Sequence, residues 1–324
     1  PDPTDTPLMR HLLAGGGGFV GSHLTELLLA RGDDVVVVDN FATGRRSNVA
    51  HLADHPRFAL IEHDITTQLP AFDTVFDSIL DLASPASPAD FATMPLEILA
   101  VGSTGTRNLL DLALEHNARF FLASTSEVYG DPLVHPQPET YWGNVSSIGP
   151  RSCYDEAKRF SEAITMAYHR VHGLDIRIAR IFNTYGERMR PDDGRVVNTL
   201  VVQAMRGDPI TLHGDGSQTR SFCHVADEII GLTAVLDGHL IGPVNVGNPN
   251  EFTIRQLAEL VVELTGSSSD IITVPLPPER EGDPVQRRPD ISLINTAYGW
   301  QPTIDLDEGL TRMIHWFRTE EGIG

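Results

Sequence analysis

Tyr154 and Lys158 lie four residues apart in a stretch whose pattern predicts a helix. On a helix, this spacing places both side chains on one face, one turn apart. The chain has 24 lysine and arginine residues, and Lys158 is its only lysine. Lowering a tyrosine pKa from near 10 to about 7 requires roughly 4 kcal/mol, which one cation ~4 Å away supplies at an effective dielectric constant near 20. Tyr154 is therefore expected to act as a general base, and the alternative is an ordinary ion-dipole pair on a helix surface.

A glycine-rich turn lies near the N-terminus, between an apolar run at 11–14 and a helical pattern at 22–30. Its glycines at 15, 18 and 21 form a spacing variant of the dinucleotide-binding fingerprint. Such a turn lets the backbone approach a pyrophosphate, and the N–H groups of the following helix face that anion. A flexible linker is the alternative, but the flanking strand and helix patterns favour cofactor binding.

Acidic residues follow the next two expected strands. Asp39 ends the β-branched run 35–38, where a carboxylate accepts hydrogen bonds from a ribose and repels a 2′-phosphate. NAD is therefore expected rather than NADP, although Arg45 and Arg46 weaken this preference. Asp64 follows the expected strand 57–62 and is predicted to accept a hydrogen bond from the adenine amino group. The complete expected cofactor site is Gly15, Gly18, Phe19, Val20, Gly21, Asp39, Asn40, Asp64, Ile65, Leu82, Ala83, Tyr154 and Lys158.

The order of these patterns predicts an α/β fold with a Rossmann-like, doubly wound parallel sheet. Further strands are expected at 75–83, 119–123 and 175–181, and a long helix at 96–116. Ligands of such sheets collect at the C-terminal ends of the strands, which is where Ser124–Glu127 fall. Short helical patterns and turns after Asn183 predict a smaller, mixed substrate-binding domain. The expected domains are 8–183, with a return segment near 225–250, and 184–324.

Bulk composition disfavours several classes of partner. A net charge of −20 argues against binding to nucleic acid or to an anionic membrane, and an anionic substrate would need a local arginine cluster. No apolar run reaches the ~18 residues of a membrane-spanning helix. Cys153 and Cys223 form neither a disulfide framework nor a metal motif, and no metal is expected. The protein is expected to be cytoplasmic, with a disordered or trimmed first seven residues.

With these motifs in order, the chain resembles the extended short-chain dehydrogenases/reductases that act on nucleotide sugars, and more narrowly the UDP-glucuronic acid decarboxylases. The glycine turn and Tyr154-x-x-x-Lys158 mark the superfamily, whereas Ser124-Thr125-Ser126-Glu127 and Arg287-Arg288-Pro289-Asp290 mark the narrower group. Dehydratases of this superfamily carry Asp-Glu where this chain has Ser126-Glu127. A serine cannot protonate a departing hydroxyl as that aspartate does, which favours decarboxylation.

The resemblance implies NAD-dependent decarboxylation of UDP-glucuronate to UDP-xylose, through oxidation at C4, loss of CO2 and re-reduction. It assigns Thr125 to the 4-oxygen, Ser126 and Glu127 to the carboxylate end, and Arg287 to C5 as general acid or carboxylate partner. The implied catalytic residues are Thr125, Ser126, Glu127, Tyr154, Lys158 and Arg287. The implied substrate-binding residues are Ser84, Pro85, Asn183, Arg195, Val196, Arg220 and Arg287. A homodimer formed through the helices around 96–116 and 153–172 is also implied.

Three positions depart from the resemblance, and several alternatives stay open. Ala100 and Gly102 stand where the decarboxylases commonly carry Lys and Asn, and Asp81 stands where His is usual. The nucleotide is UDP or dTDP. A nucleotide-hexose 4,6-dehydratase or 4-epimerase shares the same motifs in part, and a non-catalytic module that binds NAD or a nucleotide sugar is the alternative outside enzymes.

Overall fold

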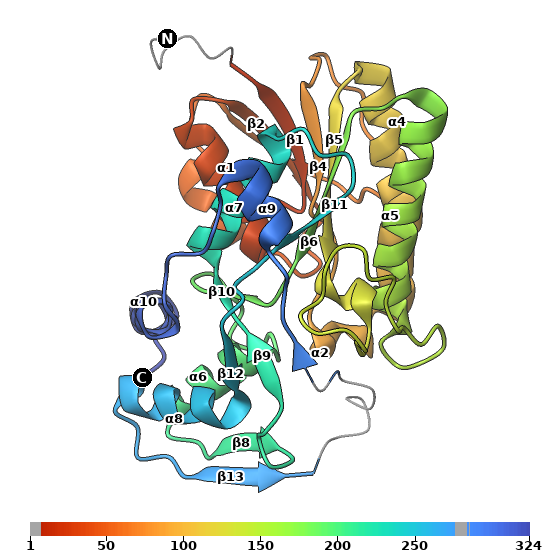
Figure 1. Ribbon diagram of the computed structural model, residues 1–324. Coiled ribbons are helices and arrows are strands. Elements are labelled where there is room, and N and C mark those ends of the chain that lie inside the picture. Colours follow the sequence, from red (N-terminus) through yellow and green to blue (C-terminus); the bar gives the residue numbers. More distant parts are fainter. Residues whose placement is uncertain (1–7, 276–283, 285) are drawn as a thin grey trace.

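A seven-stranded parallel sheet forms the centre of the protein, in a computed structural model that describes residues 8–275, 284 and 286–324. The expectation for the first seven residues lies outside the described residues. The strand order is β11-β6-β5-β4-β1-β2-β3 (Figure 1). The strands are β1 (Arg10–Ala14), β2 (Asp34–Asp39), β3 (Phe58–Glu62), β4 (Ser78–Asp81), β5 (Arg119–Thr125), β6 (Ile176–Ile181) and β11 (Pro243–Val246). The order reverses between β1 and β4, which confirms the predicted doubly wound sheet; β4 is shorter than the expected strand at 75–83.

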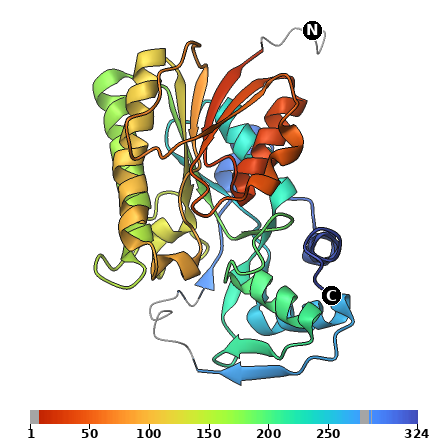
Figure 2. The same cartoon turned by 180° about the vertical axis from the view of Figure 1, so that it is seen from behind.

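Helices cover both faces of the sheet (Figures 1 and 2). Neighbouring strand residues alternate between the faces: Leu12 and Phe120 belong to one hydrophobic core, and Leu13 and Phe121 to the other. The first core lies beneath α4 (Thr106–His116) and α5 (Ser152–His172), and the second beneath α1 (Phe19–Ala30), α7 (Val225–Asp237) and α9 (Ser292–Tyr298). Because both faces are buried, the strands appear in the sequence as continuous apolar runs.

The single helix expected at 96–116 is interrupted. It consists of α3 (Pro95–Ala100), a π-helical turn η3 (Val101–Gly105) and α4. The reason lies at Gly102, where a Cβ atom would stand 2.7 Å from the Cβ of Ala157 on α5. The close approach also lets Ser161 Oγ donate a 2.8 Å hydrogen bond to Gly102 O. Glycine at this position therefore allows η3 to lie directly against the helix that carries Tyr154 and Lys158.

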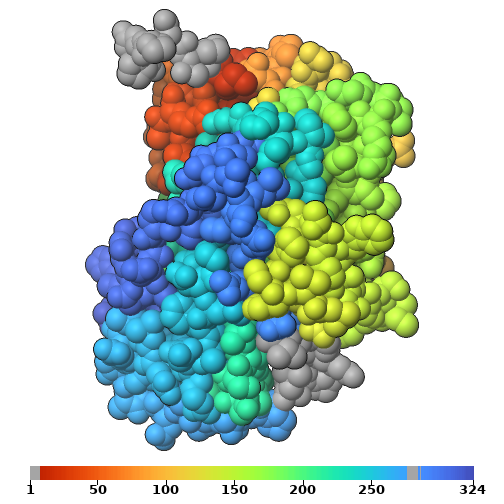
Figure 3. Space-filling view, in the orientation of Figure 1, coloured from red at the N-terminus to blue at the C-terminus, as the bar shows by residue number. Residues whose placement is uncertain are grey.

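A smaller region follows the sheet and has its own hydrophobic core. Its elements are β7 (Thr184–Tyr185), α6 (Val196–Arg206), β8 (Ile210–His213), β9 (Thr219–Ser221), β10 (Cys223–His224), β12 (Glu251–Thr253), α8 (Ile254–Thr265), β13 (Ile271–Val274), β14 (Gln286–Arg287) and α10 (Leu306–Glu320). Between β10 and β12 the chain returns to the sheet to form α7 and β11, and later returns again to form α9. In Figure 3 the C-terminal segment, in blue, passes over both regions.

Replacing Gly102 by alanine is expected to destabilise the protein by about 1–3 kcal/mol, because the new methyl group collides with Ala157. This loss exceeds the gain in helix propensity, which is about 1 kcal/mol. The control is Gly242→Ala, whose methyl group would meet no atom within 4 Å. Urea unfolding of both variants measures the difference, and equal stabilities would contradict the close packing of η3 on α5.

Candidate active site

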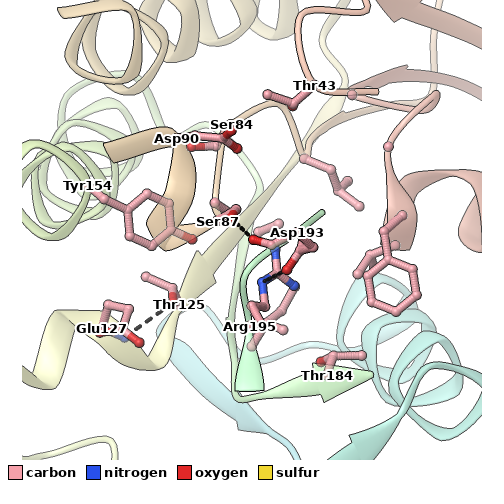
Figure 4. A pocket seen from close by; sticks show the side chains of 18 of the residues that line it. Thr43, Ser84, Ser87, Asp90, Thr125, Glu127, Tyr154, Thr184, Asp193 and Arg195 are labelled. Atoms are coloured by element: carbon pink, nitrogen blue, oxygen red, sulfur yellow. Dashed lines mark hydrogen bonds and ion pairs between the residues drawn. The ribbon is translucent and has the colours of Figure 1, made fainter. Parts of the chain in front are cut away.

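One pocket runs along the C-terminal ends of β1, β4 and β5 and reaches the segment that follows β7. Figure 4 shows Tyr154, Thr125, Glu127 and Arg195 around this space, although they come from distant parts of the chain. The predicted residues that line it are Gly15, Gly18, Phe19, Val20, Gly21, Leu82, Ser84, Thr125, Ser126, Glu127, Tyr154, Lys158, Asn183 and Arg195. The structure therefore brings the glycine turn and the Tyr-Lys pair into one cleft.

A second pocket adjoins the first and extends into the smaller region. Glu127, Arg151, Asn183 and Arg195 line both pockets, so the two are continuous. The predicted residues Val196, Arg220 and Arg287 line the second pocket. The remaining predicted residues line neither of these two pockets: Asp39, Asn40, Asp64, Ile65, Ala83 and Pro85.

The glycine turn has the shape and polarity that a pyrophosphate requires. A Cβ atom on Gly21 would lie 2.1 Å from Gly15 O, so only glycine permits this packing of turn against helix. Gly18 is the N-cap of α1, and neither a side-chain cap nor an acidic residue occupies the first helical turn. The N–H groups of that turn therefore remain available to an anion, and the turn fits a dinucleotide cofactor.

Asp39 has a role that its sequence position did not reveal. Its Oδ2 accepts a 2.8 Å hydrogen bond from Gly17 N, and its Oδ1 accepts one of 2.8 Å from Phe41 N. Burial raises the pKa of this carboxyl, and the two backbone donors oppose that change. Asp39 thus fixes the glycine turn, while its bond to a ribose stays a prediction. Asp64 likewise accepts hydrogen bonds from Thr66 and from Asn40 Nδ2.

The two arginines next to Asp39 are both held by glutamates. Arg46 forms an ion pair with Glu62 and lies over the Phe41 ring. Arg45 forms a 2.5 Å ion pair with Glu321, just after α10. Each positive charge is therefore compensated within the protein, which supports the preference for NAD over a 2′-phosphorylated cofactor.

Lys158 and Tyr154 are both buried at the bottom of the first pocket. Lys158 Nζ donates a 2.9 Å hydrogen bond to Ala123 O on β5. Burial raises the pKa of Tyr154 to about 12, against the lowering influence of the Thr125 hydroxyl and the Arg195 charge. Among the protein's own groups, desolvation of the phenol therefore outweighs the Thr125 hydroxyl and the Arg195 charge, and the expected lowering of this pKa by Lys158 together with the nicotinamide charge stays a prediction.

Two arginines converge on Glu127, in the short helix η4 (Ser126–Tyr129). Arg151 Nη2 lies 2.5 Å from Glu127 Oε2, and Arg287 Nη1 binds Glu127 Oε1. Burial alone would raise the pKa of Glu127, but the two guanidinium groups lower it to about 2. Arg151 was not among the residues predicted from the sequence. A positive charge at the N-terminus of α5, where the helix dipole disfavours cations, was the signal that could have revealed it.

Asp155 is a second residue that was not predicted from the sequence. It lies in the first turn of α5, is buried, and its Oδ1 has no hydrogen-bond partner among the described residues. Burial and then the charge of Glu127 raise the pKa of Asp155 to about 7, although Arg151 and Arg287 act in the opposite direction. Asp155 therefore changes its charge near neutral pH, directly beside Tyr154 in the chain.

The polar residues of the second pocket are held by the smaller region. Arg195 is the N-cap of α6, and its Nε lies 3.1 Å from Asp193 Oδ1. Asn183 Nδ2 donates to Ser221 O at 3.4 Å. Arg220 donates to the carbonyl oxygens of Thr219 and Pro284, at 2.8 Å and 2.5 Å. Three basic or amide side chains thus reach one polar pocket.

Two further features are absent from the part of the chain that the structure describes. No group of three or more His, Cys, Asp and Glu side chains is placed to hold a metal ion in that part of the chain. None of its helices is both long and apolar enough to cross a membrane.

The sequence matches the family model described as GDP-mannose 4,6 dehydratase over residues 12–313, and the chain belongs to this family of extended short-chain dehydrogenases/reductases. It is 52% identical to UDP-glucuronic acid decarboxylase 1 of Arabidopsis thaliana over 310 residues, which cover 96% of this chain and 70% of the plant protein. It is 48% identical to UDP-glucuronic acid decarboxylase 5 of the same plant over 333 residues, which cover 100% of this chain and 96% of the plant protein. The resemblance deduced from the motifs is therefore confirmed.

A solved relative shows the same architecture with ligands. The UDP-glucuronic acid 4-epimerase of Bacillus cereus, in complex with UDP-glucuronic acid and NAD, matches with a TM-score of 0.84 and 27% identity. The match covers 96% of this chain and 99% of the epimerase chain.

The raised pKa of Asp155 predicts how stability depends on pH. In the unfolded chain this carboxyl has a pKa near 4, whereas in the folded protein the pKa is about 7. Between these values the folded protein retains a proton that the unfolded chain releases, so this group lowers stability as the pH rises. The free energy of unfolding of the wild type, minus that of Asp155→Asn, is expected to fall by up to about 1.4 kcal/mol per pH unit in this range.

Urea unfolding at several pH values measures this difference. The control is Asp208→Asn, which removes an exposed carboxylate. A flat difference for Asp155→Asn would contradict the assignment.

Proposed function

We propose that the protein is an NAD-dependent nucleotide-sugar decarboxylase that converts UDP-glucuronate to UDP-xylose. The observation that carries this proposal is the convergence of Arg151 and Arg287 on Glu127, beside Tyr154. Both guanidinium groups line the second pocket, and each carries several N–H donors. A substrate carboxylate would share the two arginines with Glu127 through paired, charge-assisted hydrogen bonds, which a neutral hexose does not offer.

The protein uses NAD, and the glycine turn, Asp39 and Lys158 are the residues that would hold it. Bound NAD+ supplies a hydride acceptor for C4 of the sugar, returns the hydride at the end of the cycle, and brings a positively charged ring to the site. That charge matters because the protein's own groups raise the pKa of Tyr154 to about 12. We therefore assign ionisation of the phenol to the cofactor-bound protein, in which Lys158 and the nicotinamide charge act together.

The chain's own residues have the following roles in the proposed reaction. Tyr154 removes the proton of the 4-hydroxyl, and Thr125 hydrogen-bonds the same oxygen. The 4-ketone makes the sugar a β-keto acid, so the electrons released by C5–C6 cleavage enter a carbonyl group and CO2 departs. Ser126 replaces the acid that a dehydratase needs at this position, and CO2 requires no such acid. After C5 takes up a proton from solvent and C4 is reduced again, Tyr154 returns its proton to the 4-oxygen.

Arg287 suits the role of carboxylate partner better than that of proton donor. It is buried at 1% exposure, and it donates to Glu127 and, at 2.8 Å, to Gly130 O. A guanidinium is a very weak acid, whereas its paired N–H groups match the two oxygens of a carboxylate. In the adjoining pocket, Asn183, Arg195 and Arg220 are proposed to bind the diphosphate and the nucleotide.

We also propose the division of the chain into a cofactor region at 8–183, with a return segment near 225–250, and a mostly substrate-binding region at 184–324. The first contains the glycine turn, and the second contains β14 with Arg287. A cytoplasmic location is supported by two cysteines that are both buried and unbridged, as in proteins of a reducing compartment.

A homodimer is supported by an apolar surface on α3 and α5. Leu96 and Leu99 of α3 are 75% and 39% exposed, and Phe160 of α5 is 48% exposed. The two helices pack against each other, and a second copy of the chain docked on them would cover these side chains.

Incubation with UDP-glucuronate and NAD+ is expected to release one CO2 per nucleotide sugar and to yield UDP-xylose, detected by mass and NMR. Tyr154→Phe is expected to lower kcat at least 10²-fold, since it removes the proton acceptor. Tyr168→Phe is the matched control, because Tyr168 lies on the same helix but lines neither pocket, and its hydroxyl donates to Asp111.

Parallel reactions separate the alternatives. Turnover of dTDP-glucuronate in preference to UDP-glucuronate would change the assigned nucleotide. Conversion of UDP-glucose or dTDP-glucose without CO2 would indicate an epimerase or dehydratase. A Tyr154→Phe protein equal to the wild type in every assay would point to a non-catalytic binding module.

The wild-type protein is expected to sediment as a dimer, and Leu96→Glu together with Phe160→Glu is expected to convert it to monomers by placing charges in the apolar contact. Sedimentation equilibrium measures the mass. The matched control is Leu133→Glu, at an 81% exposed leucine of the loop before α5, which leaves the mass unchanged. A wild-type monomer would contradict the proposed contact.

A further inference from the structure

Lys158 is a buried ammonium with few partners. It is 5% exposed, and Ala123 O is its one hydrogen-bond acceptor among the described residues. An ammonium has three N–H donors, and a buried charge is costly unless an opposite charge lies nearby. A group that compensates the charge of Lys158 therefore influences Tyr154 indirectly, through Lys158.

Asp81 lies at the right place to provide that charge. It ends β4, is 1% exposed, and pairs in register with Leu122, the residue before Ala123 on β5. Its Oδ2 accepts a 2.8 Å hydrogen bond from Thr106 Oγ1 of α4. Its register partners Ala14 and Leu122 belong to the core beneath α4 and α5, so the Asp81 carboxylate and the Lys158 ammonium lie on the same side of the sheet, near enough to influence each other without a direct ion pair.

Hydrogen bonds tie Asp81 to the helix that carries Lys158. Thr106 Oγ1 lies 3.2 Å from Ser161 Oγ, and Ser161 is one turn after Lys158 on α5. The other partner of Asp81 is the backbone N–H of Ala83, at 3.3 Å. Both donors are neutral, so they orient the carboxylate without cancelling its charge.

The other charged groups around Lys158 are already paired. Glu162 of α5 also attracts the ammonium, but it accepts hydrogen bonds from Arg180 Nε at 2.8 Å and Arg180 Nη2 at 2.7 Å. Tyr154 is the remaining titratable neighbour on α5, and burial keeps it protonated. Asp81 is thus the carboxylate near Lys158 for which the described residues provide no other cation.

We propose that Asp81 is the counter-ion of Lys158 and holds the single lysine of the chain in its ammonium form. The charge coupling runs in both directions: burial lowers the pKa of Lys158 and raises that of Asp81, and each charge opposes the shift of the other. Asp81 acts as a positioning residue, since it supports the charge that Lys158 contributes to the ionisation of Tyr154. Only the last step, the ionisation of Tyr154, rests on the proposed function.

The uniqueness of Lys158 makes a direct test possible. Protein grown with lysine labelled with 13C at Cε shows one lysine side-chain signal, whose pH titration reports the protonation of this amine alone. We expect the wild type to show the ammonium form at pH ~7.5, and Asp81→Asn to move the titration midpoint down by at least one pH unit, a tenfold loss of proton affinity. Thr106→Val is the matched control, because it removes the hydrogen bond to Asp81 but keeps the carboxylate, and it is expected to shift the midpoint by less than half as much.

A neutral amine in the wild type at pH ~7.5, or equal midpoints in the wild type and Asp81→Asn, would overturn the proposal. The first outcome requires no variant, so the test stands even if Asp81→Asn fails to fold. With UDP-glucuronate, Asp81→Asn is expected to shift the alkaline limb of kcat to lower pH while KM changes less than twofold. Failure of the proposed function would appear as an inactive wild type, and the NMR titration would still decide the role of Asp81.

Discussion

The hydrogen bond from Lys158 Nζ to Ala123 O joins α5 to the C-terminal end of β5, and the arrangement of the site depends on it. The ammonium lies in a buried position, so its donor cannot exchange this carbonyl for water. The bond fixes the rotation of α5 about its axis, and with it the direction of Tyr154, one turn earlier. On the strand side, the residues directly after Ala123 are Ser124 to Glu127, so the same contact positions Tyr154 and the side chains that face it.

The net charge of this protein is negative, whereas several arginines line the candidate active site. The chain has a net charge of −20, yet Arg151, Arg195 and Arg287 surround the space beside Tyr154. Charges separated by more than about 8–10 Å of salt water are largely screened, whereas buried charges keep their influence. The overall acidity therefore has little effect on an anion inside the cleft, where the nearby arginines dominate the local potential.

The sequence allowed much of the sheet and part of the site to be predicted. The glycine spacing, the β-branched run before Asp39 and the Tyr-Lys spacing are local patterns, and local patterns report local structure. The interruption at Gly102 was missed because it depends on contact with Ala157, 55 residues away. Arg151 was missed because it is defined by its contact with Glu127, which a linear pattern does not encode.

The influence of burial on the pKa of Tyr154 could not be predicted for a related reason. The sequence gives the spacing of Tyr154 and Lys158, but it does not give the burial that raises the pKa of the phenol. Burial depends on residues from several elements, such as Phe91, whose ring stacks on that of Tyr154 at 5.1 Å. The pKa of Tyr154 therefore depends on contacts between distant elements, which the sequence alone does not show.

The return of β11 to the sheet limits how this enzyme can be recombined with its relatives. β11 pairs with β6 along Pro243–Val246 but comes from the second half of the chain. A chimera made by joining residues 1–183 to a foreign C-terminal half would thus replace an edge strand of the seven-stranded sheet as well as the smaller region. A foreign strand that did not match β6 would leave that edge open to pairing with other molecules, which promotes aggregation. Exchange of specificity is therefore better attempted by grafting short stretches, such as the segment before α6, than by cutting the chain in two.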